Sequence, residues 1–232
     1  MQPIRGRFDQ RLNELSQDIA RLGSLTDEAI EQSTRALSAR DVALARQIGE
    51  NDRVINAMRY QIEEQAYALL ATQQPMARDL RQIASVISIV TDIERMADHA
   101  AGIARLVVRM GDELPTETPT AIFQMAEVGR RMLHQRLDAY LASDAVLARA
   151  VAEQDDEMDD LYAQVSKQLF DQMVADPSSI ACSSYQLWVA HNLERIGDRT
   201  TNICERTIYV ATGQLTDLDD LQDEADPHYD RV

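Results

Sequence analysis

Residues 92–98 have the sequence DIERMAD, and residues 192–198, which lie 100 positions later, have the related sequence NLERIGD. A second match lies upstream, where residues 38–46 read SARDVALAR and residues 141–149 read LASDAVLAR, at an offset of 103. The change of offset places a three-residue deletion in the second copy, between the two matches. Two matches in the same order indicate that the chain consists of two copies of one structural unit.

Each copy reads as three helices. The chain has 232 residues but only eight glycines and six prolines, so few turns and long helices are expected. We therefore predict an all-α fold of two tandem, similar three-helix bundles built from six long helices. The predicted helices lie near residues 5–38, 41–72, 76–109, 119–142, 144–175 and 178–212.

The segment from Gly111 to Pro119 is predicted to separate the copies, because it combines a helix-stop glycine with two prolines. We assign residues 1–110 to the first repeat and residues 118–213 to the second. Residues 214–232 form a C-terminal tail with seven acidic residues and one arginine. Such a charge run is typical of a solvated chain end.

Composition excludes several classes of protein. Hydrophobic residues make up 45% of the chain, enough for a real core, and the formal net charge is −16. Strong negative charge argues against nucleic acid as the main partner but allows metal cations or a basic protein surface. No run of about 18 apolar residues occurs, so no direct membrane insertion is expected. The two cysteines weakly favour a reducing cytoplasm.

Catalysis has no positive support in the sequence. We find no phosphate-binding Gly-rich loop, no Gly-x-Ser-x-Gly nucleophile elbow and no Cys-x-x-Cys pair. The Glu-x-x-His pair of ferritin-like di-iron sites is also missing.

The third predicted helix carries two carboxylates at the edge of its apolar stripe. At 100° per residue, Glu94 and Asp98 fall beside the stripe, one turn apart. Asp92 falls on the opposite side and is not grouped with them. Arg95 and His99 also point away from the stripe.

Antiparallel pairing of the second and third helices brings further polar residues to the same level. With the turn near residue 75, Asp52 is expected beside Asp98, and Asn56 beside Glu94. The first half therefore offers three carboxylates and one amide at this edge.

The second half repeats the arrangement with more acidic residues. The same pairing places Asp155 beside Asp198 and Asp159 beside Glu194, with Asn202 one turn further on the same face. Four carboxylates are expected to converge there. His191, three residues before Glu194, is either an added ligand or a hydrogen-bonded surface histidine.

Carboxylates packed so closely repel one another, and burial makes the repulsion worse, so something must offset it. Carboxylates on facing helices commonly bind hard metal ions, and oxygen ligands favour Mg, Mn, Ca or iron over zinc. The alternative is an ion-pair network with the nearby arginines Arg53, Arg95, Arg195 and Arg199. The candidate metal ligands are Asp52, Glu94, Asp98, Asp155, Asp159, Glu194, Asp198 and Asn202.

At these residues the chain resembles the PhoU family of phosphate-transport accessory and signalling proteins. The resemblance covers roughly residues 5–212 and is clearest in residues 74–81, 92–100 and 192–205. It implies two similar three-helix bundles and a repeated Glu/Asp-x-x-x-Asp signature that binds metal ions, in some members as multinuclear iron clusters. It also implies a cytoplasmic, often dimeric repressor of the phosphate-starvation response. The implied partners are the phosphate ABC transporter ATPase and a membrane sensor histidine kinase.

Two residues of the first half depart from the family pattern. Asn56 replaces a carboxylate, and Gly102 stands where the second copy has Asn202. These departures make the second half the stronger candidate for a metal site. The signature lands on Glu94 with Asp98, Glu194 with Asp198, Asp155 with Asp159 and, imperfectly, Asp52 with Asn56.

We therefore expect a non-enzymatic, metal-binding regulator of phosphate uptake that acts as a homodimer. We expect the bound metal to be a divalent or trivalent ion, namely iron, Mn, Mg or Zn. Two alternatives stay open: a carboxylate-bridged helical metalloenzyme, and a structural helical scaffold in which arginines pair with the carboxylates.

Overall fold

The computed structural model describes residues 4–111, 117–152, 156–216 and 218. Within these ranges the chain is helical and forms no strand, so the all-α prediction is confirmed. The elements are α1 (Ile4–Ala39), α2 (Val42–Gln73), α3 (Arg78–Met110), α4 (Thr120–Ala142), α5 (Ala145–Ala152), α6 (Asp156–Ala175), the 3₁₀ helix η1 (Pro177–Ser179) and α7 (Ile180–Thr212).

Local sequence signals account for several helix ends. The Asp41 carboxylate accepts the Leu44 N–H over 2.9 Å and caps α2, and Asp144 accepts the Leu147 N–H over 2.9 Å at the start of α5. Gly213 ends α7 in the left-handed region, at a φ of 81°.

The second half differs from the prediction in its middle element. The sequence pattern predicted one helix over residues 144–175, whereas the structure has two, α5 and α6. Residues 153–155 between them, which include the predicted ligand Asp155, lie outside the described residues. The first turn of α6 holds Asp156, Glu157 and Asp159, and carboxylates are favourable at a helix N-terminus.

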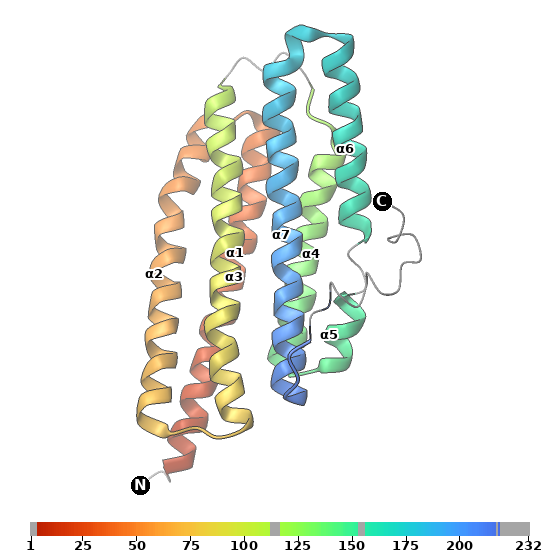
Figure 1. Cartoon of the computed structure of the whole chain (residues 1–232). Coiled ribbons are helices and arrows are strands. Elements are labelled where there is room, and N and C mark those ends of the chain that lie inside the picture. The colour runs from red at the N-terminus through yellow and green to blue at the C-terminus, as the bar shows by residue number, and fades with distance from the viewer. Residues whose placement is uncertain (1–3, 112–116, 153–155, 217, 219–232) are drawn as a thin grey trace.

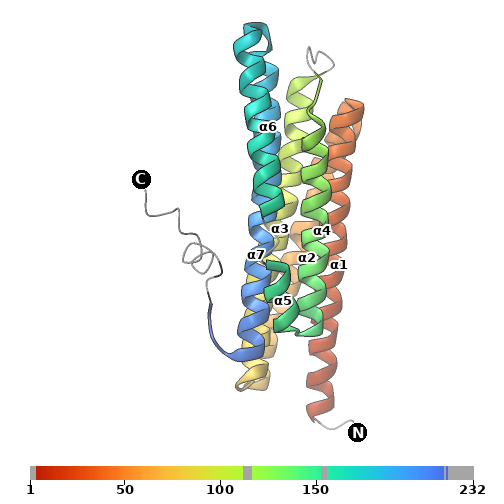
Figure 2. The same cartoon turned by 90° about the vertical axis from the view of Figure 1, so that its right-hand side faces the viewer.

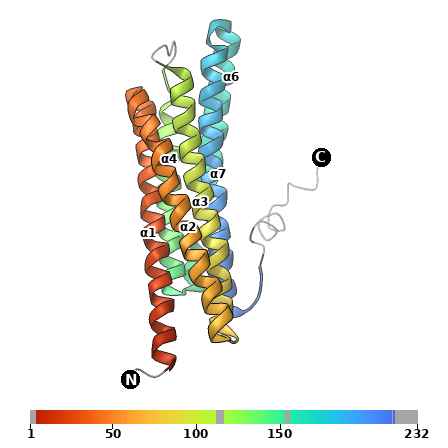
Figure 3. The same ribbon diagram turned by 90° about the vertical axis from the view of Figure 1, so that its left-hand side faces the viewer.

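The two copies lie side by side as bundles, α1–α3 and α4–α7 (Figure 1). Helix α3 packs against α7, and α1 against α4, so each contact joins equivalent helices of the two copies. Figures 2 and 3 show α3 and α7 on one side of the molecule and α1 and α4 on the other. The paired helices run in opposite directions, which relates the copies by an approximate twofold axis across the bundles.

One hydrophobic core runs through both halves. It includes Leu15 of α1, Ile93 of α3, Leu133 of α4 and Ile196 of α7, all almost fully buried. Each such side chain stabilises the fold by about 1.5–3 kcal/mol through loss of apolar surface to water. None of the helices that the structure describes is both long and apolar enough to cross a lipid bilayer.

Polar residues mark the seam between α3 and α7. Asn202 Nδ2 donates to Asp92 Oδ1 over 3.0 Å, and Arg199 Nη1 lies 3.6 Å from the same oxygen. At the symmetry-related position Asn192 faces Gly102, where an added Cβ would lie only 2.9 Å from Asn192 Oδ1. Gly102 therefore admits the partner amide, which gives its departure from the family pattern a packing reason.

A second polar contact joins α1 to α4 on the other side of the molecule. The Arg130 guanidinium donates to both Asp27 oxygens, over 2.8 and 3.1 Å, and to Glu31 over 3.0 Å. Burial alone would raise the pKa of Asp27, but Arg130 outweighs it, with help from His134 Nε2 at 3.2 Å, and the pKa is lowered. The Asp27 carboxylate is therefore held ionised at the contact between α1 and α4.

Candidate metal centre

A pocket of about 450 Å³ opens between α6 and α7 and contains most of the predicted second-half ligands. Asp159 comes from α6, whereas Glu194, Asp198 and Asn202 come from α7. These four predicted residues therefore line one cavity. The pocket is lined by Met132, Met158, Asp159, Glu194, Arg195, Gly197, Asp198, Arg199, Thr201 and Asn202.

Helical spacing sets the acidic wall. Glu194 and Asp198 lie four residues apart, which puts both carboxylates on one face of α7. Gly197 lies between them, and a Cβ there would meet Met158 Cγ at 3.3 Å. The buried side chain of Met158 therefore packs close beneath the carboxylates and gives the pocket an apolar floor.

Glu194 has an oxygen that its surroundings do not satisfy. His191 Nδ1 lies 3.3 Å from Glu194 Oε2, but this buried oxygen accepts no hydrogen bond from the residues that the structure describes. His191 itself packs against the edge of Trp188, at 5.8 Å between ring centroids. A buried carboxylate oxygen without a hydrogen bond is costly, and a cation is one way to relieve that cost.

Asn202 belongs both to the pocket and to the seam. Its NH₂ group donates to Asp92, which leaves Oδ1 as the atom available to a cation. Asp92, which the helical pattern set apart from the site, is buried in the seam. Burial raises the pKa of Asp92, although the Asn202 hydrogen bond and the Arg199 charge oppose the shift.

In the first half the predicted carboxylates are close enough to affect one another. Burial raises the pKa of Asp52, and the charge of Asp98 raises it further. Glu94 behaves in the same way, through burial and then Asp98. The predicted pairing of Asp52 with Asp98 is therefore consistent with the structure. Asp52 Oδ1 is buried and accepts no hydrogen bond within the described ranges, while Asn56 Nδ2 donates to Oδ2 over 3.1 Å.

An arginine lies beside the first-half carboxylates. Arg59 Nη1 donates to Glu63 Oε1 over 2.8 Å, and Arg59 Nε lies 3.9 Å from Glu94 Oε1. The guanidinium also stacks on the Tyr60 ring at 4.1 Å. Arg59 was not among the four arginines considered from the sequence, because they were chosen by distance along the chain. The arginine alternative is thus partly realised in this half.

The seam carries positive charge next to the second-half pocket. Burial lowers the pKa of His99, and the positive charges of Arg195 and Arg199 lower this pKa further. The hydrogen bond from His99 Nδ1 to Asn192 Oδ1, at 3.1 Å, acts in the opposite direction. Both arginines also line the pocket. The pocket is therefore acidic towards α6 and basic towards α3.

As they stand, the described residues form no group of three or more His, Cys, Asp or Glu side chains arranged to hold a metal ion. The donor chemistry nevertheless fits a hard cation, since unsatisfied carboxylate oxygens occur in both halves, at Asp52 and Glu194. Binding would require the carboxylates around each site to close on the ion. Asp155, the remaining predicted ligand, lies outside the described residues.

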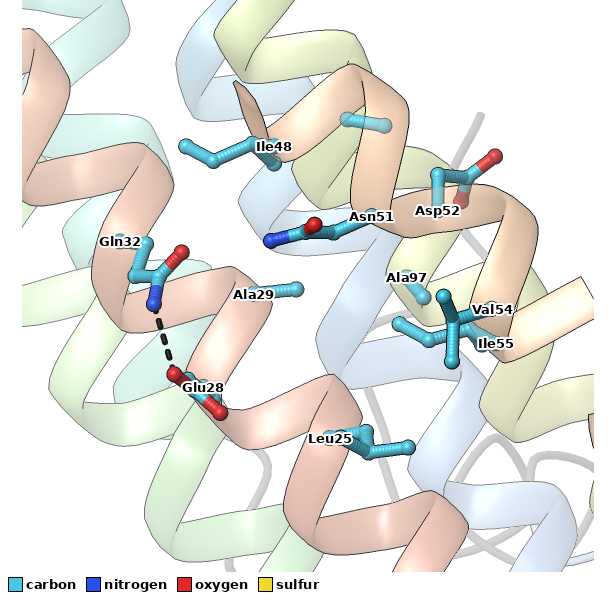
Figure 4. Close-up of a pocket in the computed structure, with 11 residues that line it drawn as sticks. Leu25, Glu28, Ala29, Gln32, Ile48, Asn51, Asp52, Val54, Ile55 and Ala97 are labelled. Atoms are coloured by element: carbon cyan, nitrogen blue, oxygen red, sulfur yellow. Dashed lines mark hydrogen bonds between the residues drawn. The ribbon is translucent and has the colours of Figure 1, made fainter. Parts of the chain in front are cut away.

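Sequence reasoning missed a second cavity, in the first half. Figure 4 shows this pocket of about 220 Å³ between α1 and α2, with Ala29 and Ile55 among its apolar lining and Asn51 between the two helices. At the offset of 103, the second half has Met132 where the first half has Ala29, and Met158 where the first half has Ile55. The sequence did contain a sign of this cavity, because the first copy has the small Ala29 at the position where the second copy has the large Met132.

Comparison with known proteins gives consistent matches over most of the chain. A family model described as PhoU domain matches residues 19–107 and 122–207. The phosphate-specific transport system accessory protein PhoU homolog of Clostridium acetobutylicum is 38% identical over 92% of this chain and 98% of its own. The homolog of Rhizobium meliloti is 35% identical over 90% and 89%.

Solved structures agree with this. The phosphate transport system regulatory protein PhoU from Streptococcus pneumoniae superposes with a TM-score of 0.84 at 34% identity, covering 90% of this chain and 99% of that one. PhoU from Pseudomonas aeruginosa gives a TM-score of 0.83 at 32% identity, covering 89% and 100%.

Proposed function

Since the chain belongs to the PhoU family, we propose that it is an accessory protein that regulates a phosphate transport system, and that it does so as a metal-binding protein. The observation that carries the metal-binding part is the second-half pocket, where Asp159, Glu194, Asp198 and Asn202 line one cavity. The regulatory part rests on the names of the relatives.

In this proposal a hard cation such as Mg, Mn or iron is held in the second half by Glu194, Asp198, Asp159 and the Asn202 carbonyl. The ion would neutralise carboxylates that repel one another and so stiffen this face. Asp52, Glu94 and Asp98 form the weaker counterpart site, because Asn56 replaces a carboxylate and Arg59 already supplies positive charge.

The proposed partners are the phosphate ABC transporter ATPase and a sensor histidine kinase. In this proposal the chain forms a homodimer in the cytoplasm and binds these partners there. The net charge of −16 suits a basic surface on such partners and does not suit nucleic acid. The helices that carry the two clusters, α2 with α3 and α6 with α7, lie on either side of the α3–α7 contact (Figure 1). We therefore propose that one partner surface contacts both clusters. We assign no catalytic step to either cluster.

Metal analysis after dialysis tests the metal-binding part. The wild-type chain is expected to retain metal, and the isosteric double substitution Glu194→Gln with Asp198→Asn is expected to lose the second-half ion. The matched control is Glu94→Gln with Asp98→Asn, which should leave the second-half ion in place. Equal stoichiometry in the wild type and the second-half variant would exclude this site.

Pull-down of the transporter ATPase with each of these proteins then tests the regulatory part. Binding is expected to be stronger with metal than with chelator. Absence of binding in both conditions would count against the proposed partner.

A structural scaffold is the second candidate, and the contact of Arg59 with Glu94 and Glu63 favours it. In that case no metal survives dialysis and substitution of Arg59 destabilises the chain. Retained metal in the wild type would decide against it.

A further inference from the structure

Two sets of side chains on α7 line the second-half pocket from opposite sides. Glu194 and Asp198 form the wall towards α6, where Asp159 adds a third carboxylate. Arg195 and Arg199, also four residues apart, form the wall towards α3. Metal binding by the acidic wall leaves the second wall without a function.

The second wall consists of hydrogen-bond donors. Arg199 Nη1 lies 3.6 Å from Asp92, but Arg199 Nε is buried and makes no hydrogen bond to any described residue. Thr201 also lines the pocket, where its hydroxyl accepts a hydrogen bond from Arg136 Nη1 over 3.3 Å. Two arginines on one helix face, one of which has a buried N–H without a hydrogen bond to a described residue, suit the binding of a tetrahedral oxyanion.

The first copy keeps one of these arginines, as Arg95, but lacks the other donors. At the offset of 100, Arg199 corresponds to His99 and Thr201 to Ala101. His99 is already committed to Asn192, at 3.1 Å. The two acidic positions on the helix, in contrast, are the same in both copies. Arg199, and with it the pair of arginines, thus distinguishes the second copy from the first, although both share the carboxylates and the first arginine.

We propose that the second-half pocket binds inorganic phosphate together with a cation, with the carboxylates holding the cation and Arg195 and Arg199 contacting the phosphate. The inference rests on the proposed function, because three carboxylates would repel a free phosphate dianion unless a cation stood between them. A cavity of about 450 Å³ has room for both ions and their waters, since water occupies about 30 Å³ per molecule.

Equilibrium dialysis of the full chain with radiolabelled inorganic phosphate tests the proposal, in Mn²⁺ and in chelator. We expect phosphate to be retained in Mn²⁺ only. Arg195→Gln and Arg199→Gln should each weaken phosphate binding by on the order of tenfold or more, the loss typical of one charge-assisted contact, while Mn²⁺ stoichiometry stays unchanged. The matched control is Arg95→Gln at the equivalent first-half position, which should bind phosphate as the wild type does.

The outcomes separate this inference from the metal site. Retained Mn²⁺ without phosphate overturns the inference and leaves the metal site standing, whereas loss of both overturns both. Equal phosphate binding in chelator overturns the role of the cation, and equal displacement by sulfate overturns selectivity for phosphate. Thermal melts identify any variant that fails to fold, and Arg199→Lys, which keeps the charge but not the fork of donors, is expected to bind more weakly than wild type while melting normally.

Discussion

Asn202 Nδ2 donates a hydrogen bond of 3.0 Å to Asp92 Oδ1, and this bond joins the lining of the second-half pocket to the first half of the molecule. Asp92 is buried, so its carboxylate depends on Asn202 and Arg199 for polar contacts in place of water. The two copies therefore share a polar contact next to the residues that we propose to bind metal. A change at the pocket can be transmitted to the other half through one amide.

Replacing Asn202 by alanine should destabilise the protein. The substitution removes the hydrogen bond and leaves the Asp92 oxygen buried without it, which typically costs about 1–3 kcal/mol. Urea unfolding measures the loss as a lower midpoint at an unchanged slope. Asn51→Ala is the control, because Asn51 is an exposed asparagine on α2. A variant as stable as this control would show that the seam bond is not needed.

The contact of Arg130 with Asp27 predicts a specific dependence of stability on pH. The pKa of Asp27 is lowered in the folded state, so its contribution is present above the ordinary value near 4 and is lost as pH falls through the lowered pKa. Arg130→Met should therefore reduce the free energy of unfolding at pH 7 by about 1–3 kcal/mol and flatten its decline below pH 4.

The neighbouring Arg131 supplies a matched control for that measurement. Arg131 pairs with Glu157, and both side chains are about half exposed, at 48% and 57%. Exposed ion pairs contribute about 0–1 kcal/mol, so Arg131→Met should leave the pH profile nearly unchanged. Equal effects of the two substitutions would mean that burial at the α1–α4 seam does not strengthen the Arg130 contact.

Asp52→Asn should stabilise the metal-free protein slightly. The pKa of Asp52 is raised by burial and by Asp98, so the ionised side chain destabilises the fold at pH 7, and this penalty disappears as pH falls below the raised pKa. We expect a gain of a few tenths of a kcal/mol at pH 7, the size typical of one like-charge pair, and none in acid.

Urea unfolding at pH 7 and pH 3 measures this difference. Glu50→Gln, an exposed position on the same helix, controls for the change in net charge. The same Asp52→Asn substitution should weaken first-half metal binding, so a loss of stability in the absence of metal would contradict the electrostatic explanation.

Periodicity predicted the helices, apart from the division of residues 144–175 into α5 and α6, because each helix buries an apolar stripe. The antiparallel pairing of the second and third helices put Asp52 beside Asp98, and their mutual pKa effects are consistent with it. The same reasoning placed Asp159, Glu194 and Asp198 together, and they line one pocket. Spacing along the chain shows which residues share a helix face, and the geometry of a hairpin shows which residues of two helices lie at the same level.

The seam could not be found in the same way. Asp92 and His99 point away from the apolar stripe of their own copy, a pattern that equally describes a residue in water and one packed against another bundle. Only the arrangement of the two copies shows that both lie between α3 and α7. Arg59 was missed for a related reason, since its partner Glu94 is distant in sequence and reaches it through helix packing.

The first-half pocket gives a prediction that compares the two copies directly. Ala29→Met introduces the side chain that the second copy has at Met132, and the open space between α1 and α2 is expected to accept it (Figure 4). Filling a cavity commonly stabilises by about 0.5–2 kcal/mol. The reciprocal change, Met132→Ala, removes a buried side chain and should cost about 2–5 kcal/mol.

Thermal and urea unfolding of both variants measure these effects, and the opposite signs are the test. The pocket is lined by Asp52 and by Ala97, which is next to Asp98, so metal retention by the first half should also be compared before and after filling. A destabilising Ala29→Met would mean that the helices cannot accommodate the methionine without strain, and that the cavity is closed in solution. Stabilisation with unchanged metal retention would show that filling the cavity does not disturb metal binding by Asp52 and its neighbouring carboxylates.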